Sequence, residues 1–138
     1  MVAQHSQYTA RAIQTASPGQ LVVMLYDGMI RFLGQSKAAM ERGERGEAGL
    51  KMSRAQAIVT ELRCSLDMTQ GSISDNLASI YDWVSEELMG ARLENDPARV
   101  GRVSDMMTDL RGAWAQIAAT EKPTAERSRP VVGVNLAG

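Results

Sequence analysis

The chain has 138 residues, which is the length of one domain, and 44% of them are hydrophobic, which is enough for a core. The formal net charge is −1, and no basic cluster or long apolar run occurs, so the sequence disfavours nucleic-acid binding and membrane insertion. The single cysteine excludes an intrachain disulfide, and nine methionines against 4% aromatics predict an aliphatic, thioether-rich interior.

Residues 1–16 are predicted to form a loose N-terminal arm. The segment is polar and small apart from Tyr8 and Ile13. Because it lacks the apolar core of a signal peptide, we expect a cytoplasmic protein. Tyr8 and Ile13 are large enough to dock on an apolar groove, and the alternative is a frayed end.

Ser17, Pro18 and Gln20 indicate the start of a first helix, predicted over residues 18–42. Ser17 can cap the first turn, Pro18 suits the first helical position, and Gln20 can complete a capping box. Gly43 suits the end of the helix, since glycine adopts the left-handed conformation at little cost. The helix has a wide apolar face, typical of a helix with more than one neighbour, formed by Leu21, Val22, Leu25, Gly28, Met29, Phe32, Leu33, Ala39 and Met40.

Three further helices are predicted over residues 47–68, 74–95 and 97–119, the last with Asp96 as its cap and Pro97 in its first turn. Their apolar residues recur at spacings of three and four, which is typical of helices in a bundle. In the first of the three this stripe comprises Met52, Ala55, Val59, Leu62 and Leu66, and Leu50 and Ile58 widen it. In the second it comprises Ile73, Leu77, Ile80, Val84, Leu88 and Ala91, and in the third Val100, Val103, Met107, Leu110, Trp114 and Ile117.

The segment 121–138 is predicted to form a flexible tail. It contains Pro123, Pro130 and several charges, with a short apolar patch at Val131, Val132 and Val134. Short connections between the four helices favour antiparallel neighbours. We therefore predict an all-α fold, an antiparallel up-down four-helix bundle over residues 17–120, with the arm and the tail at its ends.

Residue types that carry catalysis or bind metals are sparse. A di-metal site in a bundle needs inward Glu-x-x-His pairs, but the single histidine, His5, lies in the arm. Cys64 has no histidine partner for nucleophilic catalysis. We therefore predict no enzyme activity, no metal and no cofactor, and expect the bundle to bind another helix in an apolar groove. Two alternatives stay open: a generic helical adaptor or dimerising scaffold, and a metal-dependent bundle enzyme.

A series of short motifs runs in order through about residues 8–119, comprising Tyr8, Gln14-Thr15-Ala16-Ser17-Pro18, Met24-Leu25-Tyr26-Asp27-Gly28, Ile30-Arg31-Phe32-Leu33, Ser65-Leu66-Asp67, Ile80-Tyr81-Asp82-Trp83 and Leu110-Arg111-Gly112-Ala113-Trp114. In this series the chain resembles the FliS family of flagellin-specific export chaperones. It departs from the family at Ile80 and Trp83, where leucine and tyrosine are usual, and at Gln70-Gly71, where Gly-Gly is usual.

The resemblance implies a bundle that binds the C-terminal segment of flagellin in the bacterial cytosol. It implies that the protein prevents premature polymerisation and aids delivery to the flagellar type III export gate. It further implies that the arm caps an apolar surface near the flagellin site. The partner-binding candidates are therefore Tyr8, Ile13, Gln14 and Thr15 of the arm, with Tyr26, Asp27, Ile30 and Tyr81 at motif positions of the bundle. A homodimer is left open.

Overall fold

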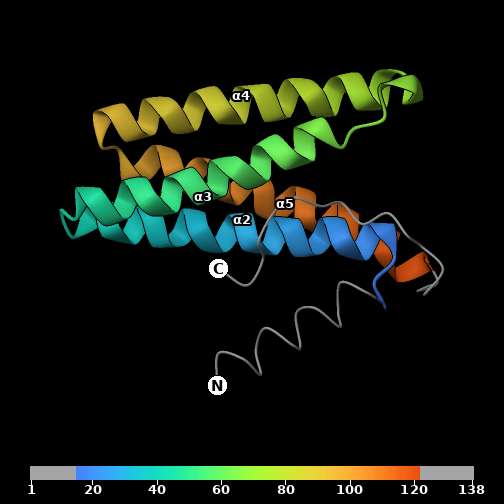
Figure 1. The fold of residues 1–138 in the computed structure, drawn as a ribbon, viewed down its shortest axis with the longest axis horizontal. Helices are drawn as coiled ribbons and strands as arrows, with labels where there is room; N and C mark the ends of the chain where they lie inside the picture. Colours follow the sequence, from blue (N-terminus) through green and yellow to red (C-terminus); the bar gives the residue numbers. More distant parts are fainter. Residues whose placement is uncertain (1–14, 122–138) are drawn as a thin grey trace.

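A computed structural model describes residues 15–121, and within them the chain forms four long α-helices and no strand (Figure 1). The helices are α2 (Pro18–Glu41), α3 (Arg45–Cys64), α4 (Ser72–Glu94) and α5 (Pro97–Thr120). A short 3₁₀ helix, η1 (Met68–Gln70), connects α3 to α4. The predicted all-α four-helix bundle is confirmed.

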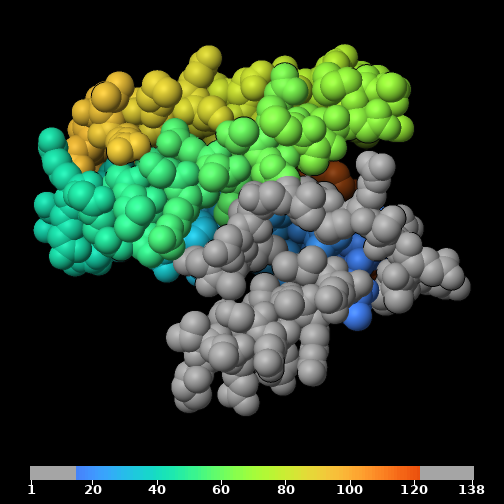
Figure 2. Space-filling model, in the orientation of Figure 1, coloured from blue at the N-terminus to red at the C-terminus, as the bar shows by residue number. Residues whose placement is uncertain are grey.

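The four helices run alternately in opposite directions, and each packs against two neighbours (Figure 1). Helix α2 contacts α3 and α5 most extensively, and α4 also contacts α3 and α5. Helices α2 and α4 therefore face each other across the diagonal of the bundle. Figure 2 shows the outer face of α3 and α4, which form one continuous surface.

The helix ends follow from local hydrogen bonds that the sequence specifies. The Gln20 N–H donates to Ser17 Oγ at 3.2 Å, and the Ser17 N–H donates to Gln20 Oε1 at 2.9 Å, so the predicted capping box is present. Asp96 accepts hydrogen bonds from two backbone N–H groups in the first turn of α5. Gly43 has a φ of 76°, a left-handed conformation that ends α2 without strain.

The connection between α3 and α4 differs from the sequence prediction. Helix α3 ends at Cys64, four residues before the predicted end, and α4 begins at Ser72, two residues before the predicted start. The reason lies in Asp67, whose carboxylate accepts the Thr69 N–H and starts η1. Ser74 Oγ also donates to the Asp67 carbonyl oxygen at 2.6 Å, which joins the connection to the first turn of α4.

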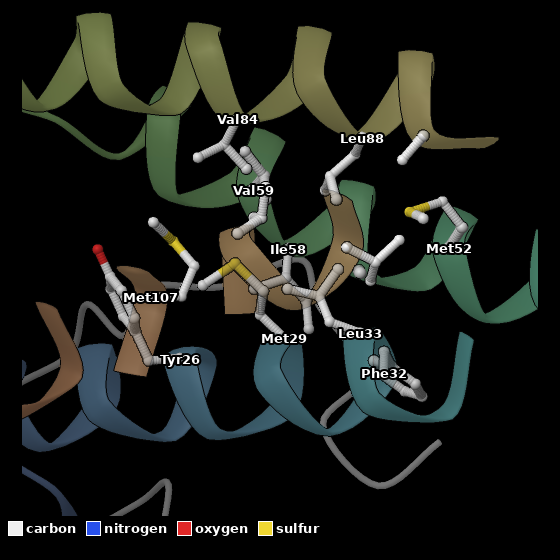
Figure 3. Close-up of a cluster of buried hydrophobic side chains, with 14 of the residues drawn as sticks. Tyr26, Met29, Phe32, Leu33, Met52, Ile58, Val59, Val84, Leu88 and Met107 are labelled. Carbon is white, nitrogen blue, oxygen red and sulfur yellow. The ribbon is translucent and has the colours of Figure 1, made fainter. Parts of the chain in front are cut away.

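The core is aliphatic and thioether-rich, as predicted (Figure 3). Met29, Met52 and Met107 are fully buried among branched residues from all four helices. Three residues of the predicted stripes are exposed: Leu50 is 48% exposed, Ile73 67% and Ile117 50%. Leu50 is two residues from the buried Met52, or about 160° around α3, so it faces away from the core. Ile73 and Ile117 each directly precede a buried residue and lie about 100° around their helices from it.

Candidate binding surface

A pocket of about 310 Å³ lies where α3 ends and α4 begins. Its apolar lining comes from all four helices and comprises Val22, Leu62, Leu66, Ile73, Leu77, Tyr81 and Trp114. The polar lining comes from Ser65, Asp67, Gln70 and Ser74, around the connection between α3 and α4. We call this the end pocket.

Two buried tyrosines support the end pocket. The Tyr26 and Tyr81 hydroxyl oxygens are 2.6 Å apart and form a hydrogen bond across the diagonal of the bundle. Figure 3 shows Tyr26 extending from α2 towards the bundle interior. Burial raises the pKa of Tyr26, although hydrogen bonds with Tyr81 and Trp114 act to lower it. Burial also raises the pKa of Tyr81, and its proximity to Tyr26 raises it further. Both phenols are therefore neutral hydrogen-bonding groups at physiological pH.

An exposed row of apolar side chains follows the junction of α4 and α5. Trp83 is 42% exposed, Met106 37%, Ile117 50% and Ile73 67%, and Ile80 and Leu110 are half-buried between this row and the core. We call these six residues the α4–α5 strip.

The Glu87–Arg99 ion pair shows why the six residues of the α4–α5 strip share one surface. Arg99 Nε donates to Glu87 Oε1 at 2.9 Å, which fixes the facing sides of α4 and α5. The strip residues of α4 precede Glu87 by 4, 7 and 14 positions, and those of α5 follow Arg99 by 7, 11 and 18 positions. Each spacing is close to a whole number of helical turns, so all six lie on the facing sides.

The two ends of the α4–α5 strip differ in polarity. At one end, Ile73 belongs to both the strip and the end pocket, so the two apolar surfaces are continuous. At the other end Arg99 pairs with Glu87 and Glu94. The hydrogen bond from Arg99 holds the pKa of Glu87 below its usual range. The apolar surface therefore ends at a charged cluster.

The structure brings only some of the predicted site residues to this surface. Tyr81 lines the end pocket and Tyr26 hydrogen-bonds to it. Asp27 is exposed and pairs with Arg111 of α5, whereas Ile30 is half-buried against the core. The predicted arm residues Tyr8, Ile13 and Gln14 lie outside the described residues, and Thr15 is exposed at their edge.

The sequence prediction missed the α4–α5 strip as a surface. It placed Ile73, Ile80, Leu110 and Ile117 in stripes expected to pack in the bundle, and it did not consider Met106. A signal was present, because Met106, Leu110, Ala113 and Ile117 repeat at spacings of four, three and four beside the Val103–Met107–Trp114 line. The second line lies beside the first and contains the exposed Met106 and Ile117.

The described residues hold few groups for other chemistry. Residues 15–121 contain no cluster of three or more histidine, cysteine, aspartate or glutamate side chains placed to hold a metal ion. Cys64 is exposed and unbonded to another cysteine. None of the helices within this range combines the length and apolarity that a membrane span requires. What the surface does offer is a continuous apolar area between two helices.

Comparison with known proteins identifies similar chains. The profile of a family described as "Flagellar protein FliS" matches residues 1–121. The chain is 33% identical over 120 residues to the flagellar secretion chaperone FliS of Salmonella typhimurium, covering 86% of this chain and 87% of that protein. The corresponding protein of Vibrio cholerae is 35% identical over 106 residues, covering 76% and 78%. That of Bacillus subtilis is 29% identical over 118 residues, covering 86% and 88%.

Proposed function

The chain belongs to the FliS family of flagellar secretion chaperones, and from this premise we propose that it binds the C-terminal segment of flagellin in the bacterial cytosol. In this role it prevents premature polymerisation of flagellin and aids delivery to the flagellar type III export apparatus. It acts by holding its client, with no cofactor and no covalent step. The observation that carries the proposal is the apolar surface formed by the α4–α5 strip and the end pocket.

The shape of this surface suits an amphipathic segment. From Ile73 to Trp83 the α4–α5 strip rises ten steps along α4, which is about 15 Å at 1.5 Å per residue. An amphipathic helix of three turns has the same length and would place its apolar side on the strip. The end pocket would then receive an apolar side chain from the end of that helix.

Binding an unstructured segment also explains how a chaperone can release its client. A segment that folds as it binds loses conformational entropy, which weakens the affinity for a given buried area. The chaperone therefore covers a long apolar side of the client segment without binding it irreversibly. Release at the export apparatus then requires only a modest competing interaction.

The N-terminal arm is proposed to cap the apolar surface when no client is bound. Tyr8 and Ile13 would supply the apolar contacts, with Gln14 and Thr15 linking them to the start of α2. The capping box at Ser17 fixes the point where the arm leaves the bundle. A client would have to displace the arm, so the arm would lower the apparent affinity.

Calorimetric titration tests the proposal directly. Full-length flagellin monomer and a version without its C-terminal segment are each titrated into the protein. We expect binding to the first and little or none to the second. Equal binding of the two would contradict the proposal, and sedimentation of the protein alone would then test the alternative of a dimerising scaffold.

A matched pair of variants tests whether the α4–α5 strip is the binding surface. Ile117→Lys places a charge on the strip, whereas Leu93→Lys makes the same kind of change at a residue that is 80% exposed and outside the strip. Burying the exposed half of an isoleucine contributes about 1 kcal/mol, so Ile117→Lys should weaken binding by about fivefold or more. Equal affinities for the two variants would place the client elsewhere.

A further inference from the structure

A second apolar cleft, of about 350 Å³, lies between the first turns of α2 and the last turns of α5. Its lining comprises Gln20, Val23, Met24, Ala115, Ala118 and Ala119. Val22 lines the end pocket, whereas Val23 and Met24 line this cleft, so the two hollows lie on different sides of α2. We call it the α2–α5 cleft. The described structure does not fill it.

The last described residue, Glu121, lies at the edge of the α2–α5 cleft. Glu121, directly after α5, accepts a hydrogen bond from the Gly19 N–H through Oε1 at 2.8 Å. A β-carbon at position 19 would lie 2.0 Å from that oxygen, so glycine is what allows the contact. Gly19 is next to Gln20 and Ala118 is three residues before Glu121, so Glu121 lies within about one helical turn of the cleft.

The sequence beyond Glu121 contains a segment that fits the α2–α5 cleft. After Pro130 come Val131, Val132, Gly133, Val134, Asn135 and Leu136, with no charged side chain among them. In an extended segment Val132, Val134 and Leu136 lie on one side, about 6.6 Å apart. Along α2 the cleft extends from Gln20 to Met24, a rise of four steps or about 6 Å. Two neighbouring side chains of the segment therefore match its length.

The connection between Glu121 and Val132 makes this segment the favoured occupant. A random coil of ten residues would have a root-mean-square span of about 18 Å. Ala115, at the far end of the α2–α5 cleft, lies six residues, or about 9 Å, back along α5 from Glu121. The segment therefore reaches the whole cleft without strain. A covalent connection of this length would give an effective concentration near the millimolar range, above that of any separate chain at micromolar concentration.

We propose that residues 131–136 of this chain dock in the α2–α5 cleft, with Val132 and Val134 against Val23 and Met24. The C-terminal segment then covers apolar surface that a separate chain would otherwise contact. This contact is independent of the α4–α5 strip, so it does not depend on flagellin being the client.

Methionine-methyl NMR of the full chain tests the docking. In protein labelled with ¹³C at the methionine methyl groups, the double variant Val132→Asp/Val134→Asp should shift the Met24 signal. The control Val131→Asp, on the opposite side of the extended segment, should leave it in place. The buried Met29 and Met52 signals report that the fold is intact in both variants.

Two results would overturn the inference. One is a Met24 signal that is the same in the double variant as in the parent protein. The other is a Met24 signal of the parent protein that moves to the position seen in the double variant when the parent is diluted tenfold. A contact within one chain does not depend on protein concentration, so dilution should not change it. If dilution does move the signal, a second copy of the protein would be the occupant.

Discussion

The buried hydrogen bond between Tyr26 and Tyr81 allows a quantitative test of how the bundle supports the end pocket. Tyr26→Phe leaves the Tyr81 hydroxyl buried without its partner, so we expect a loss of about 1–3 kcal/mol in the free energy of unfolding. Tyr81→Phe should cost less, since Tyr26 keeps its hydrogen bond with Trp114. The double variant removes both hydroxyls and should cost less than the sum of the single variants.

The pH dependence of the same variants tests the raised pKa values. Each tyrosine has a reference pKa of 10.0 and a higher pKa in the folded protein. The contribution of the two neutral phenols to the free energy of unfolding is therefore fully present below pH 10 and is lost as the pH rises through the folded pKa. At pH 11 the loss is about 1.4 kcal/mol for each tyrosine whose folded pKa lies above 11. The double phenylalanine variant lacks this loss, so its stability relative to the parent should rise by up to about 2.8 kcal/mol between pH 8 and pH 11.

Urea unfolding followed by far-ultraviolet circular dichroism measures both effects. The parent, the two single variants and the double variant are unfolded at pH 8 and pH 11. Comparison with the double variant cancels the titration of lysine and of Tyr8, which all four proteins share. Additive losses at pH 8 would show that the hydroxyls are not coupled. A parent and a double variant that lose stability equally at pH 11 would refute the assigned burial of the two phenols.

Other residues give independent predictions. Asp96→Ala removes the cap of α5 and should cost about 1 kcal/mol in urea unfolding; an unchanged midpoint would show that the cap is dispensable. Gly34→Ala adds a methyl group in open space and should stabilise by about 0.5–1 kcal/mol, whereas Gly19→Ala meets Glu121 and should not. Equal thermal shifts for the two glycine variants would contradict the described contact. Deletion of residues 1–14 should strengthen flagellin binding in calorimetry if the arm caps the surface, and an unchanged affinity would show that it does not.

The helices and their ends could be predicted from the sequence because the interactions that determine them are local. Ser17 and Gln20 are three residues apart, and Asp96 caps a helix that begins at the next residue. Apolar spacing also predicted the core residues on the inner sides, such as Met29, Val59 and Leu88. The motif series indicated the family, which comparison with known proteins confirmed.

The α4–α5 strip and the end pocket were decided by the tertiary structure. Spacing shows which side of a helix is apolar, but it cannot show how much of that side a neighbour covers. Ile80 and Leu110 belong to regular stripes like those of the core, yet they are only half-buried because α4 and α5 contact each other less extensively than α2 contacts its neighbours. The pairing of Tyr26 with Tyr81 and of Gly19 with Glu121 joins residues 55 and 102 positions apart. Such contacts depend on the packing of whole helices, and no local pattern in the chain records them.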